Sequence, residues 1–148
     1  MWRPGADSTW SDRCGITSNG AEPLVRDLLP LLAANPAHGF FGSVAFKYQA
    51  PEANPPRAAL LARQAGFIPT TSGEATGEPP TVEKIAGMAA ALGTKALAVA
   101  SGITPDNAAA FVPYVRYFLV STGISKGFYE FDAAKVIRLN RIVTGQLP

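Results

Sequence analysis

Short apolar runs recur along the chain and are separated by polar or amphipathic segments. Four of these runs predict strands, at residues 43–48, 67–71, 96–100 and 117–120, and a weaker strand is predicted over 6–12. The central runs are continuously apolar rather than alternating, which is typical of parallel strands that are buried on both faces. The pattern therefore indicates an α/β fold with a parallel sheet.

The segments between the strands carry apolar residues at helical spacing. Thr81 and Asp132 each precede such a segment and are suitable N-cap residues, while Gly66 and Gly93 follow helix ends. Pro30 should kink or shorten the first helix. Helices are predicted over residues 21–34, 55–65, 81–92, 105–115 and 132–143.

The strand starts are evenly spaced, which indicates repeated β/α units. Successive starts at Ser43, Phe67, Ala96 and Tyr117 are 24, 29 and 21 residues apart. A complete eight-unit barrel needs about 250 residues, whereas this chain has 148. We therefore expect a single domain over 1–148, either an open doubly wound sheet or a partial TIM barrel. Half a barrel leaves sheet edges uncovered, so we expect a homo-oligomer or a partner chain.

Composition excludes several classes of protein. Hydrophobic residues make up 47% of the chain and charged residues 16%, which excludes a disordered chain. The net charge is +2 and the basic residues are scattered, so we expect no nucleic-acid partner. No apolar run approaches the roughly 20 residues of a membrane span, and residues 1–7 lack a signal-peptide core, which predicts a cytoplasmic protein. The single cysteine, Cys14, excludes an internal disulfide and is interpreted as a small residue near a strand end. No cofactor and no metal site are predicted.

Two turns with glycine follow the last two predicted strands. Ser101, Gly102 and Ile103 follow the strand at 96–100, and Thr122 and Gly123 follow the strand at 117–120. Glycine lets backbone N–H groups approach an anion closely, and the predicted helix at 105–115 would add its N-terminal dipole. These five residues are the candidate phosphate-binding set. The alternative is that the glycines only permit tight turns.

Three further residues are candidates for catalysis. Lys47 interrupts an otherwise apolar predicted strand, so it either projects into the mouth of a site or reaches solvent by its flexible stem. Glu74, in the loop after the next strand, is either a general base or a solvated carboxylate. Asp12 is either a site carboxylate or a turn former.

Several stretches together resemble the BtpA/SgcQ-type phosphate-binding β/α barrels. They are Trp-Ser-Asp at residues 10–12, the loop at 71–80, and above all Ala-Ser-Gly-Ile-Thr-Pro-Asp-Asn at 100–107 and Val-Ser-Thr-Gly-Ile-Ser at 120–125. Their order matches strands four to eight of such a barrel. The resemblance implies the C-terminal half of a TIM-like barrel and a phosphorylated small molecule as ligand.

The sequence leaves the function open between three hypotheses. The first is a barrel protein that binds a phosphate ester, either a sugar phosphate or a nucleotide, with or without enzymatic activity. The second is a non-catalytic assembly or regulatory protein. The third is a truncated paralogue of the BtpA-like family without activity of its own. Fold alone does not choose between them.

Overall fold

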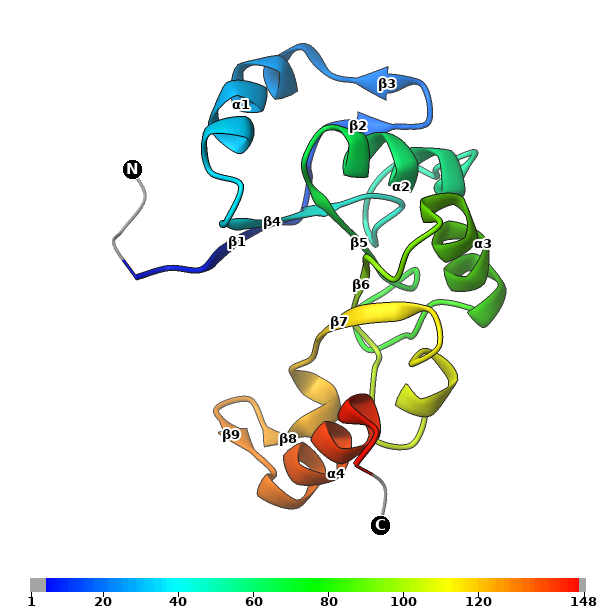
Figure 1. Ribbon diagram of the computed structural model, residues 1–148. Coiled ribbons are helices and arrows are strands. Elements are labelled where there is room, and N and C mark those ends of the chain that lie inside the picture. Colours follow the sequence, from blue (N-terminus) through cyan, green and yellow to red (C-terminus); the bar gives the residue numbers. More distant parts are fainter. Residues whose placement is uncertain (1–4, 147–148) are drawn as a thin grey trace.

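A computed structural model describes residues 5–146, and its centre is a five-stranded sheet. The strand order is β1-β4-β5-β6-β7, and every neighbouring pair is parallel (Figure 1). The strands are β1 (Ser8–Ser11), β4 (Gly39–Ser43), β5 (Ile68–Thr71), β6 (Leu97–Ala100) and β7 (Val115–Leu119). The predicted α/β class, the strand order and the parallel direction are confirmed. The sheet is open, with β1 and β7 at its two edges.

Four α-helices accompany the sheet: α1 (Pro23–Ala34), α2 (Pro55–Gln64), α3 (Val82–Leu92) and α4 (Ala133–Thr144). Both predicted N-caps are confirmed, because Thr81 accepts from the Lys84 N–H and Asp132 accepts from two N–H groups of α4. α1 runs through Pro30 rather than ending there. None of the described helices is long and apolar enough to cross a membrane.

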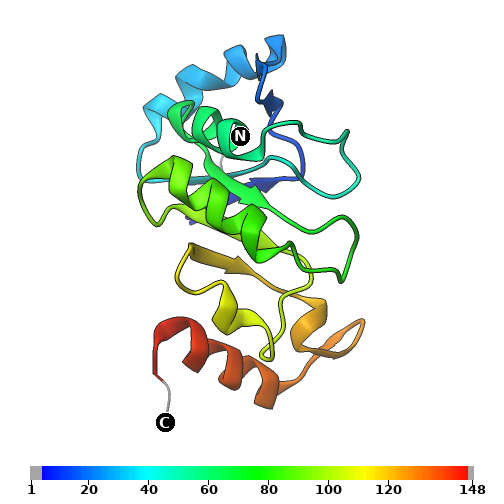
Figure 2. The same ribbon diagram turned by 90° about the vertical axis from the view of Figure 1, so that its right-hand side faces the viewer.

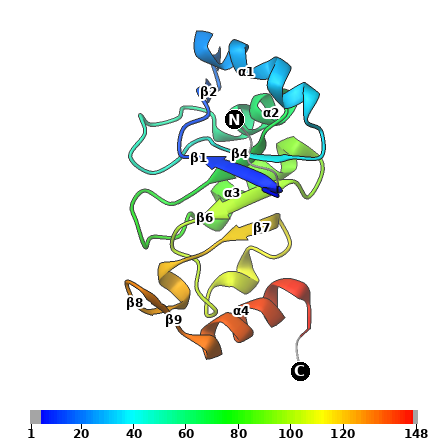
Figure 3. The same ribbon diagram turned by 90° about the vertical axis from the view of Figure 1, so that its left-hand side faces the viewer.

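The main core lies between the sheet and helices α2 and α3. These two helices pack side by side on one face of the sheet (Figure 2), and the opposite view shows the strands in front of them (Figure 3). α2 contributes Ala58, Ala59 and Ala62, whose small side chains let it approach the sheet closely. The fully buried side chains that meet there are Ile85 and Met88 of α3 and Leu97 and Val99 of β6.

The strand predicted over residues 43–48 is wrong in position. The strand is Gly39–Ser43, and residues 44–48 form a loop after it. Ala45 and Tyr48 have positive φ angles of 47° and 61°, which an extended strand does not allow. Gly42 lies in this strand, and glycine is required there because a Cβ would lie only 2.7 Å from the Phe67 ring. Lys47 is therefore a loop residue and does not interrupt a strand.

The helix predicted over residues 105–115 is also wrong. Only a short 3-10 turn, η1 (Ala108–Ala110), forms between β6 and β7. Asn107 accounts for this, because its side chain accepts from the Thr104 N–H (2.9 Å) and donates to the Gly102 carbonyl (2.8 Å). Such local bonds compete with helical hydrogen bonding. α4 packs against η1 and against a second 3-10 turn, η2 (Thr122–Ile124), and buries Leu139 there.

Two small hairpins had no counterpart in the prediction. One pairs β2 (Ile16–Thr17) with β3 (Gly20–Ala21), and the other pairs β8 (Ser125–Gly127) with β9 (Glu130–Phe131). At the tip of the second, Phe128 is 93% and Tyr129 95% exposed. Strands of two or three residues are too short to show a hydrophobic alternation.

Candidate functional site

The carboxyl ends of the parallel strands meet at one edge of the sheet, and a pocket of about 470 Å³ opens there. We call it the β6–β7 pocket, because the loops after β6 and β7 supply most of its lining. All five predicted phosphate-binding residues line it: Ser101, Gly102, Ile103, Thr122 and Gly123. Ligands of open α/β sheets bind outside the carboxyl ends of the strands, so the location suits a binding site.

The turn after β6 is held by the loop at residues 72–80. Ser101 and Gly102 both have positive φ angles, 74° and 69°. The Ser101 hydroxyl accepts from the Gly77 N–H (3.1 Å) and donates to the Ala75 carbonyl (3.2 Å). A Cβ at Gly102 would lie 2.1 Å from the Pro79 nitrogen. Packing of the two loops thus accounts for glycine at 102 and occupies the Ser101 side chain.

Gly123 is the residue at which the loop after β7 packs against the loop after β6. A Cβ at this position would lie 1.9 Å from the Ile103 carbonyl oxygen, which belongs to backbone and has little room to move. Glycine at 123 is therefore required by the close approach of the two backbones. The tight packing that explained Gly102 explains this glycine as well.

Four backbone N–H groups of these loops have no partner among residues 5–146. In the part of the chain that the structure describes, no hydrogen bond uses the N–H of Gly102, Ile103, Thr122 or Gly123 as donor. Gly102 and Ile103 are buried, and a buried N–H without an acceptor is costly. These groups are therefore available to an acceptor that enters the pocket.

Lys47 extends from the loop after β4 and lines the β6–β7 pocket. Its backbone N–H donates to the Ser72 hydroxyl (2.8 Å), and its Nζ donates to Thr76 Oγ1 (3.0 Å). The ammonium also lies 5.8 Å from the centre of the Phe46 ring. The structure thus brings Lys47 together with the five residues of the two glycine turns.

Lys84 holds the loop that carries Lys47. Its Nζ donates to the carbonyls of Ala45 (2.7 Å) and Ser72 (2.8 Å), which belong to the loops after β4 and β5. Burial lowers the pKa of its ammonium, and the nearby Glu74 carboxylate partly offsets this. The sequence prediction did not include Lys84 in the site. Its four-residue spacing from the buried Met88 of α3 was the available signal.

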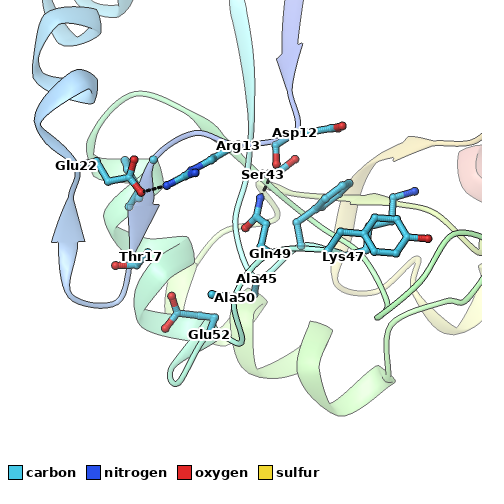
Figure 4. Close-up of a pocket in the computed structure, with 14 residues that line it drawn as sticks. Asp12, Arg13, Thr17, Glu22, Ser43, Ala45, Lys47, Gln49, Ala50 and Glu52 are labelled. Carbon is cyan, nitrogen blue, oxygen red and sulfur yellow. Dashed lines mark hydrogen bonds and ion pairs between the residues drawn. The ribbon is translucent and has the colours of Figure 1, made fainter.

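A second pocket, of about 460 Å³, lies between the loops after β1 and β4 (Figure 4). We call it the β1–β4 pocket. Asp12 lines it, together with Arg13, Glu22 and Glu52, and Arg13 forms an ion pair with Glu22. Lys47 lines this pocket too. Asp12 thus lies in the pocket that adjoins the β6–β7 pocket, and not in the β6–β7 pocket itself.

Glu74 is not brought to either pocket. It is an exposed loop residue that interacts electrostatically with Lys84. Among residues 5–146, no three His, Cys, Asp or Glu side chains gather closely enough to hold a metal ion. The candidate site therefore combines backbone N–H groups, one lysine and, in the adjoining pocket, Asp12.

No protein-family model matches the sequence, and no curated protein matches it significantly. The resemblance to BtpA/SgcQ-type barrels is therefore supported only at the level of the parallel α/β fold. The function has to be inferred from the geometry of the pockets.

Proposed function

We propose that this protein binds a phosphate ester in the β6–β7 pocket. The observation that carries the proposal is a set of backbone N–H groups with no acceptor in the described part of the chain, at Gly102, Ile103, Thr122 and Gly123. Phosphate oxygens are strong acceptors, and backbone N–H groups at the ends of parallel strands recurrently bind them. An entering phosphate would supply acceptors to these groups, of which those of Gly102 and Ile103 are buried.

The charge of the pocket supports an anionic ligand. Lys47 is the one charged residue among the described residues that line it, and none of these is a carboxylate that would repel an anion. Thr122 and Ser121 add hydroxyl groups for which the described residues show no partner. The expected contribution of a helix dipole is absent from this proposal, because η1 is only three residues long. Binding would depend on the N–H groups, the hydroxyls and Lys47.

The organic part of the ligand has an apolar wall beside it. Trp10, Phe46 and Leu119 line the same pocket, and the Trp10 and Phe46 rings meet edge to face with centroids 6.1 Å apart. Such a wall suits the carbon face of a sugar or a base. A sugar phosphate or a nucleotide is therefore the ligand class we propose, as for the BtpA/SgcQ-type barrels that these loops resemble.

Titration of isotope-labelled protein with inorganic phosphate tests the proposal. In amide-resolved NMR, the signals of Gly102, Ile103, Thr122 and Gly123 should shift saturably. The Gly93 and Gly145 amides cap helix C-termini away from the pocket and should not move. The absence of saturable shifts at the four amides at millimolar phosphate would rule out the site.

Substitution of Lys47 separates a specific site from general attraction of anions. Lys47→Met should weaken phosphate binding about tenfold, because a hydrogen bond to a charged group contributes about 1.5–3 kcal/mol. Glu74→Gln changes the net charge in the opposite sense at a residue that lines neither pocket, and it should leave the affinity unchanged. Equal effects of opposite sign would indicate long-range electrostatics instead of a bound anion.

The exposed aromatic hairpin favours a second candidate function, as an assembly protein. Phe128, Tyr129 and Phe131 are all exposed on β8–β9, and large exposed apolar groups in one place mark interaction sites. A second copy of the chain would cover them. Light scattering should then show a dimer that a Phe128→Ser/Tyr129→Ser variant loses, whereas a wild-type monomer would contradict this candidate.

A further inference from the structure

We propose that the β1–β4 pocket holds the hydroxylated part of the same ligand, which makes the ligand a sugar monophosphate. This inference rests on the proposed phosphate site and goes further, because it assigns a second pocket and a substrate class. Three observations support it: the two pockets share lining residues, the loop between them is held by several contacts, and the two pockets differ in charge.

The two pockets adjoin at the loop after β4. Phe46 and Lys47 line both of them. A phosphate bound at the β6–β7 end would therefore have Lys47 between itself and the β1–β4 pocket. A ligand that extends from the first pocket into the second would pass the side chains of Phe46 and Lys47.

The dividing loop is built to hold one conformation. Ala45 and Tyr48 both adopt left-handed backbone angles, which cost non-glycine residues energy. The Ala45 carbonyl accepts from Lys84 Nζ and from Thr71 Oγ1 (3.0 Å), and the Tyr48 hydroxyl lies 3.2 Å from Thr76 Oγ1. Strained segments that several contacts hold in place cluster at ligand sites.

The β1–β4 pocket offers acceptors to a ligand. Glu52 is occupied, because its two oxygens accept from the N–H groups of Ser18 (3.0 Å) and Asn54 (2.9 Å). Arg13 and Glu22 are paired with each other. The Asp12 carboxylate and the Gln49 side-chain carbonyl have no partner among the described residues, and the Gln49 amide is held by the Asp12 backbone oxygen (Figure 4).

These two acceptors select the part of the ligand that binds there. A carboxylate and an amide carbonyl both bind hydroxyl groups, which are donors. A second phosphate is disfavoured, because Asp12, Glu22 and Glu52 outnumber the cations Arg13 and Lys47 in this pocket. The phosphate therefore belongs in the β6–β7 pocket and the hydroxyl groups in the β1–β4 pocket.

Calorimetric titration with inorganic phosphate, ribose 5-phosphate and ribose 1,5-bisphosphate tests the inference. Ribose 5-phosphate should bind about tenfold more tightly than phosphate, and the second phosphate of the bisphosphate should bring no further gain. Asp12→Asn and Ala50→Trp, which alter and fill the β1–β4 pocket, should lower ribose 5-phosphate affinity to that of phosphate. Neither should change the affinity for phosphate itself.

Ala53→Trp is the matched control, because Ala53 is an exposed residue of the same segment that lines neither pocket. It should leave all affinities unchanged. Equal binding of phosphate and ribose 5-phosphate by the wild type would overturn this inference and leave the phosphate site standing. Loss of phosphate binding in Ala50→Trp would also overturn it. If no phosphate compound binds the wild type, the proposed function itself fails.

Discussion

The rings of Phe41 and Tyr117 meet at 5.2 Å between centroids and at an interplanar angle of 89°, although β5 and β6 lie between their strands. Neighbouring strands are about 4.8 Å apart, so the backbones of β4 and β7 are separated by three such steps. The two side chains therefore lean toward each other across the sheet. The ladder register places the fully buried Thr70 and Ala98 on the same face as the two rings. On the sheet face opposite α2 and α3, the rings of Phe41 and Tyr117 cover the strands between them.

The first prediction follows from this contact. Phe41→Ala should lower the free energy of unfolding by about 2 kcal/mol, less than for a fully buried ring because Phe41 is half-buried. In a double-mutant cycle with Tyr117→Ala, the two changes should couple by about 1 kcal/mol. Urea denaturation measures both quantities. Strict additivity of the two substitutions would contradict a direct ring contact.

The second prediction concerns the contact of Gly123 with the Ile103 carbonyl. Gly123→Ala should destabilise the protein by about 2 kcal/mol, because its Cβ would overlap backbone. Gly127→Ala is the control, since a Cβ there meets nothing within 4 Å, and it should change stability by no more than about 0.5 kcal/mol. Thermal unfolding followed by circular dichroism compares them. Similar melting temperatures for the two variants would show that the loops can move apart.

The third prediction concerns Lys84. Lys84→Met removes both hydrogen bonds to the Ala45 and Ser72 carbonyls and should cost about 2 kcal/mol of stability. It should also weaken phosphate binding, because the loop that carries Lys47 loses its support. Lys95→Met, at an exposed position after α3, should change neither quantity. Full phosphate affinity in a folded Lys84→Met variant would show that Lys47 needs no such support.

The fourth prediction concerns the buried thiol of Cys14, which donates to the Ser43 carbonyl. Burial raises the pKa of this thiol above its ordinary value of 9.0. As the pH rises, the thiol of the unfolded chain therefore loses its proton first. The contribution of this thiol to the free energy of unfolding is constant below pH 9.0 and falls above it. The loss can reach about 1.4 kcal/mol per pH unit.

Cys14→Ala tests this titration. Relative to the wild type, the variant should lack that part of the alkaline decline, and the difference should appear only above pH 9.0. Urea denaturation between pH 7 and 10.5 measures it. Parallel pH profiles for the two proteins would show that the thiol ionises equally easily in the folded and unfolded chains.

The sequence predicted the helices and strands whose positions depend only on hydrophobic burial and on capping residues. The strands β5, β6 and β7, the capped helices α3 and α4 and the parallel order all follow from apolar runs and cap residues. The misplaced β4 shows where this fails. Gly39–Ser43 contains two glycines, which disfavour a strand. Glycine is nevertheless required at position 42 of this strand, because Phe67 and Cys14 fill the space of a side chain. That reason lies in residues distant along the chain.

Six residues that line the β6–β7 pocket were singled out from the sequence, but the reason for their placement there was not. The two glycine turns do line one pocket together, and Lys47 joins them. The glycines, however, serve backbone packing between loops, and the helix expected after Ser101-Gly102 is replaced by Asn107 bonds and a 3-10 turn. Lys84 was not predicted as a site residue. Its spacing from Met88 indicates the buried face of a helix, but it does not indicate the two loop carbonyls that the ammonium contacts.

The short connection between β6 and β7 has a consequence for the order of folding during synthesis. A usual β/α unit carries its covering helix between its two strands, so each unit is complete when its second strand appears. Here α4 covers η1 and η2, inserts Leu139 into the core and joins Asp106 through Arg138, yet it follows both strands in the chain. On the ribosome, the β6–β7 unit therefore stays unfinished until residues 133–144 emerge. Helices α2 and α3 each lie between the two strands that they connect, so they are synthesised well before that point.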